Sequence, residues 1–181
     1  MAVDCSGGDI TLSTQSDIDN FQSTYGNCDR VTGYLKITES ASGNITSLNS
    51  LDGLTTIGGY LKVSTNSELS SLSGLSNITS VGGYLTISSN DALTNLDGLA
   101  NLTSVGRGLT IRYNDALTNL DGLANLTSVG GDLNIEHNDA LTNLDGLANL
   151  TSVGVGDTLF IRGNSLLTNL DGLANLTSVG G

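Results

Sequence analysis

The sequence predicts a solenoid, in which right-handed coils of about 24 residues stack with one parallel β-sheet along one face and short turns or 3₁₀ helices along the others. Three observations lead to this prediction. The 181-residue chain repeats at a fixed interval, apolar residues recur at the same places in every repeat, and an asparagine follows most of the expected strands. A fixed period of this length is typical of units that bury their apolar faces only by stacking on their neighbours.

The repeat consists of six consecutive units. The third, "GYLTISSNDALTNLDGLANLTSVG", and the fourth, "RGLTIRYNDALTNLDGLANLTSVG", share their last seventeen residues, whereas four of the first seven differ. We therefore expect an N-terminal cap, residues 1–32, followed by one solenoid domain of six coils, residues 33–181. The units span Gly33–Gly58, Gly59–Gly82, Gly83–Gly106, Arg107–Gly130, Gly131–Gly154 and Val155–Gly180.

Seven apolar positions are expected to form the interior of each coil. Leu85 and Ile87 are two residues apart, so both point inward from an extended strand, and the residues that alternate with them point outward. Each coil thus contributes one short strand to the parallel sheet. In the third unit the seven interior residues are Leu85, Ile87, Leu93, Leu96, Leu99, Leu102 and Val105.

Asparagine recurs three residues after the second inward residue of the strand. An inward-turned amide at this position can hydrogen-bond the backbone of adjacent turns, so the column is predicted to form a ladder that satisfies buried polar groups. The first unit has Ser40 at the matching place. The ladder residues are Asn66, Asn90, Asn114, Asn138 and Asn164.

The two cysteines, Cys5 and Cys28, both lie in the expected cap and outside the repeats. This placement predicts one disulfide that closes a short loop and forms in an oxidising compartment. Closing a loop of this size stabilises a protein by about 3 kcal/mol in the chain-entropy model.

The repeated pattern L-x-I-x-x-N-x-x-L-x-x-L-x-G-L resembles a leucine-rich repeat of the receptor L-domain type. The opening "CSGGDITLSTQSDIDNFQSTYGNCDRVTGYLKI" is similar to the N-terminal cap of those domains, which occur in growth-factor receptors, fungal cell-wall proteins and bacterial surface proteins. The resemblance covers nearly the whole chain from Cys5 onward. It implies the fold specifically, but it does not imply one ligand, because such domains bind many unlike partners.

The composition argues against several classes of function. A formal net charge of −12, with only six Lys and Arg, argues against nucleic-acid binding. No apolar stretch approaches the roughly 18 residues that would predict membrane insertion. His137, the only histidine, has no nucleophile at a neighbouring strand position, and clusters of His and Cys are lacking, so we expect neither an enzyme nor a metal site nor a cofactor.

The differences among the units concentrate at the outward positions of the expected strands. All the cations except Arg30, and five of the seven aromatic residues, lie in these segments. Tyrosine and arginine supply rigid contact area and directional hydrogen bonds at recognition surfaces, so this face is predicted to bind a ligand. The candidate ligand-binding residues are Tyr34, Lys36, Tyr60, Lys62, Tyr84, Arg112, Tyr113, Asp132, Glu136, His137, Phe160 and Arg162.

The predicted function is an extracellular recognition or adhesion module, secreted or at the cell surface. It binds a macromolecule through the variable face, a protein in preference to a glycan. The sixth unit has no closing cap after it, so the C-terminal coil is a candidate surface for end-to-end association. Two alternatives stay open: an ice- or surface-binding solenoid that uses rows of threonine, and a passive spacer of a surface adhesin.

One aspartate column has two interpretations. Stacked carboxylates about 5 Å apart would suit calcium. The second unit, however, has Ser73 at this position, and Ser and Asp both cap turns by accepting backbone N–H bonds, which favours capping over calcium. The column comprises Asp97, Asp121, Asp145 and Asp171.

Overall fold

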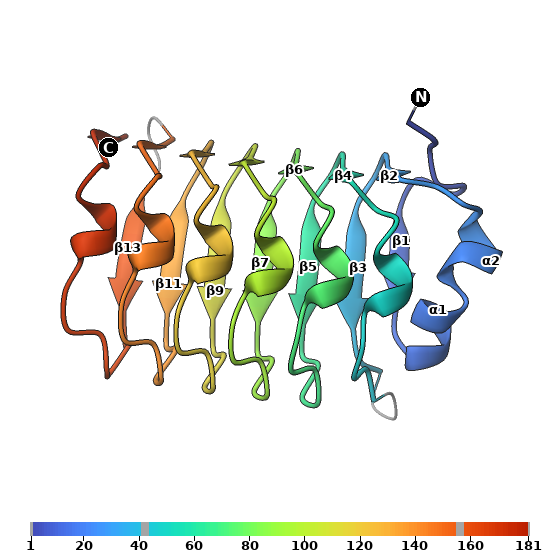
Figure 1. The fold of residues 1–181 in the computed structure, drawn as a ribbon, viewed down its shortest axis with the longest axis horizontal. Coiled ribbons are helices and arrows are strands. Elements are labelled where there is room, and N and C mark those ends of the chain that lie inside the picture. The colour runs from blue at the N-terminus through green and yellow to red at the C-terminus, as the bar shows by residue number, and fades with distance from the viewer. Residues whose placement is uncertain (1, 41–43, 155–157, 181) are drawn as a thin grey trace.

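Two parallel sheets and a row of 3₁₀ turns run along a single stack of coils (Figure 1). This computed structural model describes residues 2–40, 44–154 and 158–180. The stack has the predicted coil length and the predicted parallel sheet with 3₁₀ turns on another face, so the predicted fold class is confirmed.

The longer strands form a seven-stranded parallel sheet in the order β1-β3-β5-β7-β9-β11-β13. Equivalent residues of successive units lie in register, so that Leu85 pairs with Leu109 and Ile87 with Ile111. The register therefore brings each repeat position into a column across the sheet. The strands are β1 (Ile10–Leu12), β3 (Leu35–Thr38), β5 (Leu61–Ser64), β7 (Leu85–Ser88), β9 (Leu109–Arg112), β11 (Leu133–Glu136) and β13 (Leu159–Arg162).

A second parallel sheet, of very short strands, was not predicted from the sequence. Each strand has two residues, one half-buried and one buried in most coils, which is too short for an alternating pattern to be recognised. The expectation of a single sheet is therefore corrected to two. The strands are β2 (Arg30–Val31), β4 (Thr56–Ile57), β6 (Ser80–Val81), β8 (Ser104–Val105), β10 (Ser128–Val129), β12 (Ser152–Val153) and β14 (Ser178–Val179).

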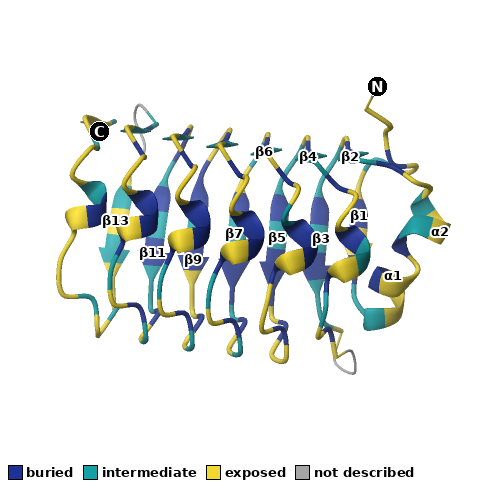
Figure 2. Ribbon diagram, viewed as in Figure 1, coloured by how far each residue is buried: buried dark blue, intermediate teal, exposed yellow. Residues whose placement is uncertain are grey.

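The core lies between the two sheets and the 3₁₀ turns (Figure 2). All seven predicted interior residues of the third unit are fully or almost fully buried. Burial decreases in the last coil, where Leu166, Leu170 and Val179 are exposed, and this is the surface predicted for end-to-end association. The turns are η1 (Asn49–Leu51), η2 (Ser73–Leu75), η3 (Asp97–Leu99), η4 (Asp121–Leu123), η5 (Asp145–Leu147) and η6 (Asp171–Leu173).

The 3₁₀ turns are capped differently from the prediction. The side chain of Asp97 makes no capping hydrogen bond. Instead, Oδ1 of Asn95 accepts the main-chain N–H of Asp97 at 3.1 Å, and Ser71 Oγ accepts that of Ser73 in the second unit. An oxygen two residues before the turn reaches this N–H because the intervening leucine is turned into the core. Capping by the aspartate column was therefore wrong.

The asparagine ladder is confirmed. Asn114 is completely buried, and its Nδ2 donates to the main-chain oxygen of Ile87 at 3.1 Å and to Oδ1 of Asn138 at 3.2 Å. Its own Oδ1 accepts from both the main-chain N–H and Nδ2 of Asn90, each at 3.2 Å. Asn66, Asn90, Asn114 and Asn138 thus each join the coil before them to the coil after them, whereas the hydrogen bonds of Asn164 among the described residues go to the coil before it.

The N-terminal segment covers the first coil with two short helices, α1 (Gln15–Asp19) and α2 (Phe21–Tyr25). Thr14 and Asp17 form a reciprocal capping box that starts α1. The predicted disulfide joins Cys5 and Cys28. Because β1 pairs with β3, this segment also supplies the first strand of the long sheet.

Candidate ligand-binding face

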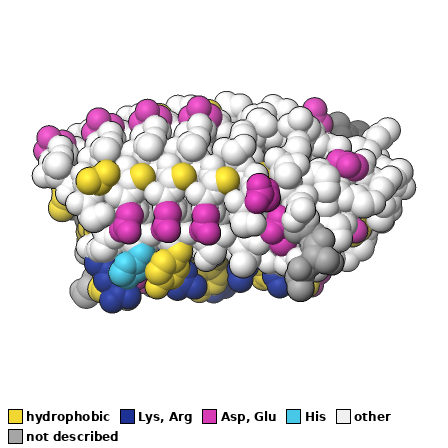
Figure 3. All heavy atoms as spheres, turned by 90° about the horizontal axis from the view of Figure 1, so that it is seen from below, with side chains coloured by type: hydrophobic (Ala, Val, Ile, Leu, Met, Phe, Trp, Pro, Cys, Tyr) yellow, Lys and Arg dark blue, Asp and Glu magenta, His cyan; other side chains and the backbone are white. Residues whose placement is uncertain are grey.

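The strand face comprises the outward residues of the long sheet from β3 to β13, together with the residues that directly flank each strand. Burial alternates along β9, where Leu109 and Ile111 are buried and Arg112 is exposed, whereas the last residues of β5 and β7, Ser64 and Ser88, are buried as well. The twelve candidate residues all occupy positions of the strand face. Seen from the end where the strands stop, Lys, Arg and His side chains gather along one side, and Asp and Glu side chains form rows on the adjoining surface (Figure 3).

Tyrosine and lysine pair up at the N-terminal end of the strand face. The rings of Tyr34 and Tyr60 stack with centroids 4.6 Å apart and planes 5° apart. Burial, followed by the proximity of Tyr34 and Asp9, raises the pKa of the Tyr60 hydroxyl. Lys36 and Lys62 lie opposite each other in the register of β3 and β5. Two like charges on neighbouring strands repel, so this pair favours an incoming negative group.

Aromatic and charged side chains form a second cluster toward the C-terminal end. Tyr113 and His137 stack with centroids 5.1 Å apart and nearly parallel planes, and the Arg112 guanidinium lies 5.7 Å from the Tyr113 centroid. Arg162 lies 4.9 Å from the Phe160 centroid and donates to Glu136 at 2.8 Å. These contacts fix side chains that would otherwise rotate freely, while Tyr113 and Phe160 stay more than 40% exposed.

The residue that follows each long strand from β5 to β13 adopts an unusual backbone conformation, whereas Glu39, which follows β3, does not. Thr65, Ser89, Tyr113 and His137 all have positive φ, between 52° and 59°. This left-handed conformation costs a non-glycine residue about 1–2 kcal/mol. Only the last unit has a glycine there, Gly163, with φ 66°. Four coils therefore keep a side chain at a place where glycine would relieve the strain.

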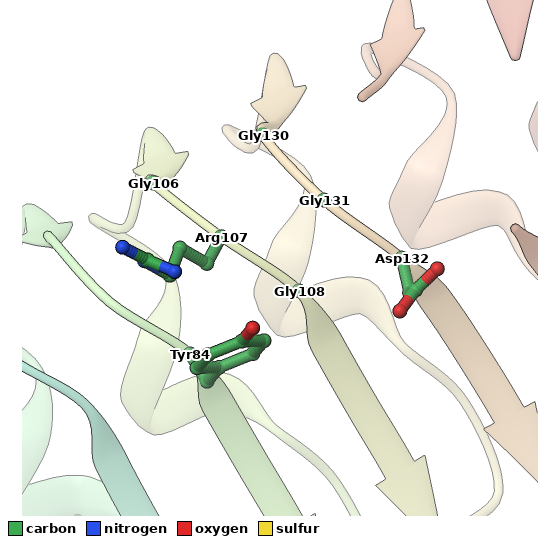
Figure 4. Close-up of a pocket in the computed structure, with 7 residues that line it drawn as sticks. All are labelled: Tyr84, Gly106, Arg107, Gly108, Gly130, Gly131 and Asp132. Atoms are coloured by element: carbon green, nitrogen blue, oxygen red, sulfur yellow. The ribbon is translucent and has the colours of Figure 1, made fainter. Parts of the chain in front are cut away.

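Tyr84 and Asp132 lie on either side of Gly108, and together they border a cavity (Figure 4). The Arg107 guanidinium lies 5.8 Å from the Tyr84 centroid. Oδ1 of Asp132 accepts from both the main-chain N–H and the hydroxyl of Thr158, and these two hydrogen bonds lower the pKa of the carboxyl group. Arg107 and Gly108 were not among the predicted site residues.

A signal for those two residues was nevertheless present in the sequence. The fourth unit begins with Arg-Gly where the three units before it begin with Gly-Tyr. In the fourth unit the large side chain therefore stands one residue earlier, at Arg107, and position 108 has no side chain.

Metal sites in proteins are built from clusters of Asp, Glu, His and Cys side chains, and the sequence predicts neither such a site nor a cofactor. Within residues 2–40, 44–154 and 158–180, no three such residues come together in a way that could hold a metal ion. His137 contacts the ring of Tyr113. No helix among the described residues is both long enough and apolar enough to cross a membrane.

The receptor L domain family matches the chain over residues 27–77 and 55–108, two overlapping stretches that cover the first three coils. The chain is a receptor L-domain-like repeat protein. Comparisons with curated proteins and with solved structures gave no match. The receptor L domain is a ligand-binding repeat family without enzymatic activity, so the family indicates recognition as the general role of this L-domain-like protein.

Proposed function

We propose that this L-domain-like protein is an extracellular recognition or adhesion module, and that a protein ligand binds across its strand face. The receptor L domain family supports ligand recognition, and the Cys5–Cys28 disulfide supports an oxidising location, secreted or at the cell surface. Aromatic and arginine side chains are the residues that most often dominate the binding energy of protein interfaces.

The observation that carries the proposal is the backbone strain retained at Tyr113 and His137, directly after β9 and β11. A passive spacer gains nothing from Tyr113 or His137 at a position where glycine removes a cost of about 1–2 kcal/mol. Strain of this kind persists where the side chain contributes something other than stability. We infer that the contribution is contact with the ligand, because Tyr113 is exposed and is held in place by Arg112 and His137.

The geometry favours a protein over an ice surface. Tyr84, Tyr113 and Phe160 project from the strand face with charged neighbours, whereas an ice plane requires a flat and regular array. The threonine rows that suggested ice binding lie on turns, and Thr118 and Thr142 use their hydroxyls to donate to main-chain oxygens of the preceding coil, at 3.2 Å and 3.1 Å.

The test compares two quadruple variants in the capture of extracellular proteins. One changes Tyr60, Tyr84, Arg112 and Tyr113 to serine on the strand face. The matched control introduces four serines on the turn face, where the exposed residues Ala100, Ala124, Ala148 and Ala174 follow the 3₁₀ turns.

We expect the full chain and the turn-face control to capture the same protein, and the strand-face variant to lose it with its melting temperature unchanged. Equal capture by both variants would assign binding to another surface. A spacer role predicts that no protein is captured by the wild-type chain, which would refute the proposal outright.

A further inference from the structure

A cavity of about 350 Å³ opens where β9 and β11 begin, and it has no counterpart in the sequence prediction (Figure 4). It arises from the Arg-Gly pair of the fourth unit, because Gly108 contributes no side chain to a column filled by Tyr84 on one side and Asp132 on the other. The lining residues are Tyr84, Gly106, Arg107, Gly108, Gly130, Gly131 and Asp132.

The ring of Tyr84 forms an aromatic wall of this cavity. A Cβ atom at Gly108 would lie only 3.2 Å from Cδ1 of Tyr84, so one edge of the ring rests against bare backbone. Tyr60, by contrast, is stacked on Tyr34 and only partly exposed. Tyr84 is 50% exposed and therefore offers a flat aromatic surface to a ligand.

Two opposite charges flank the ring. Asp132 is oriented through Oδ1, which accepts from the N–H and hydroxyl of Thr158 at 2.7 Å and 2.8 Å. Among the described residues no donor hydrogen-bonds its Oδ2, which can accept from a ligand. Arg107 lies over the ring, and in the described part of the chain no carboxylate is within ion-pairing distance of it. Its guanidinium N–H groups can donate to a ligand.

These features select a ligand by exclusion. An anion would be repelled by Asp132, and a cation by Arg107. A purely apolar group would displace water from both charges without replacing the lost hydrogen bonds, which is unfavourable. A neutral group that carries both donors and acceptors, and that presents a flat face of low polarity to Tyr84, meets all three conditions.

We infer that this cavity is a subsite for a neutral saccharide ring. The carbon face of a pyranose stacks on an aromatic ring, while its hydroxyl groups both donate to Asp132 and accept from Arg107. The volume lies within the range of small-molecule sites. This inference goes beyond the proposed protein recognition and does not depend on the Arg112 and Tyr113 cluster.

The experiment is an NMR titration of the isotope-labelled full chain with the methyl glycosides of glucose, galactose, mannose and N-acetylglucosamine. We expect at least one glycoside to shift the signals of Tyr84, Gly108 and Asp132 saturably, with a dissociation constant on the order of millimolar. Sorbitol is the ligand control because it has comparable hydroxyl groups but no ring, and we expect no saturable shift with it.

Single substitutions test whether the glycoside binds in this cavity. Tyr84→Ser removes the aromatic wall and Gly108→Val fills the cavity, and each should weaken glycoside binding by about tenfold or more. Ala124→Ser, at an exposed position on the turn face, should leave glycoside binding unchanged. Asp132→Asn keeps the side-chain shape and checks the role of the acceptor if Gly108→Val disturbs the fold.

Three results would overturn the inference: no glycoside shifts these signals, sorbitol shifts them equally, or Ala124→Ser weakens binding as much as Tyr84→Ser. A saturable shift by N-acetylglutamine amide with the same variant dependence would assign the cavity to a peptide amide instead. Failure of protein capture by the Arg112 and Tyr113 surface would leave the glycoside titration unaffected, so the two proposals fail separately.

Discussion

Replacing Asn114 by alanine tests whether the buried amide ladder holds the coils together. Asn114 lies in the middle of the stack and is completely buried, and both of its neighbours in the ladder depend on it. Asn164 offers a matched control because its Oδ1 accepts the same pair of hydrogen bonds from Asn138, but in the last coil it is only partly buried.

The magnitude follows from the groups that lose their partners. Asn114→Ala leaves the main-chain N–H of Asn90 and one N–H of its side chain without an acceptor inside the core. At about 2 kcal/mol for each buried orphan donor, the unfolding free energy should fall by about 4 kcal/mol. For a chain of this size the melting temperature should fall by about 10 °C. Water replaces the lost acceptor at Asn164, so Asn164→Ala should cost about 1 kcal/mol.

Urea unfolding of the two variants and the wild type, followed by circular dichroism, measures both free energies. The reasoning is refuted if the two variants lose equal stability, because access of water to the vacated acceptor position would then make no difference. It is also refuted if Asn114→Ala costs less than about 1 kcal/mol, the net value of an ordinary hydrogen bond.

Three further predictions concern the cap and the strand face. Cys28→Ser should lower the unfolding free energy by about 3 kcal/mol, and reductant should do the same to the wild type but not to the variant. Thr65→Gly should raise the unfolding free energy by about 1 kcal/mol by relieving positive φ, whereas Thr86→Gly within β7 should lower it. The pKa of Asp132 is lower in the folded state, so its stabilisation is present above the unfolded pKa of about 3.9 and is lost as the pH falls through the folded pKa. Asp132→Asn should therefore flatten the acid side of the curve of melting temperature against pH, and an unchanged slope would contradict this.

The fold could be predicted because repetition amplifies weak local signals. A single Leu-x-Ile stretch is ambiguous, but the same apolar spacing in six units identifies interior positions such as Leu99 and Leu102, both fully buried. The inward position of Asn90 followed from the same periodicity. The short sheet was missed because a strand such as Ser80–Val81 has no period of its own and exists only through pairing with the adjacent coils.

The positions of the candidate site residues could be predicted, but their contacts could not. Alternation along a strand places Arg112 and Glu136 outward, whereas the Arg162–Glu136 ion pair depends on side-chain conformations that no periodicity describes. The left-handed backbone after β5, β7, β9 and β11 could not be predicted either, since residues such as Thr65 and Ser89 do not indicate positive φ. Gly163, in one unit of six, is the only residue at this position whose type indicates positive φ.

The structure also changes the reason why the strand face differs from the rest of each coil. Many exposed residues that recur unchanged are tied to the preceding coil: Asn125 Nδ2 donates to the main-chain oxygen of Ala100 at 2.7 Å, and Thr127 Oγ1 to that of Thr103 at 3.2 Å. A side chain at Gly122 would collide with the carbonyl group of Leu96. Contacts between stacked coils therefore explain why these positions are the same in successive units. The strand face is free from this constraint, and this freedom explains part of its variation. Freedom alone would favour glycine or small polar residues after each strand, so the residue that points to recognition is the strained and exposed Tyr113.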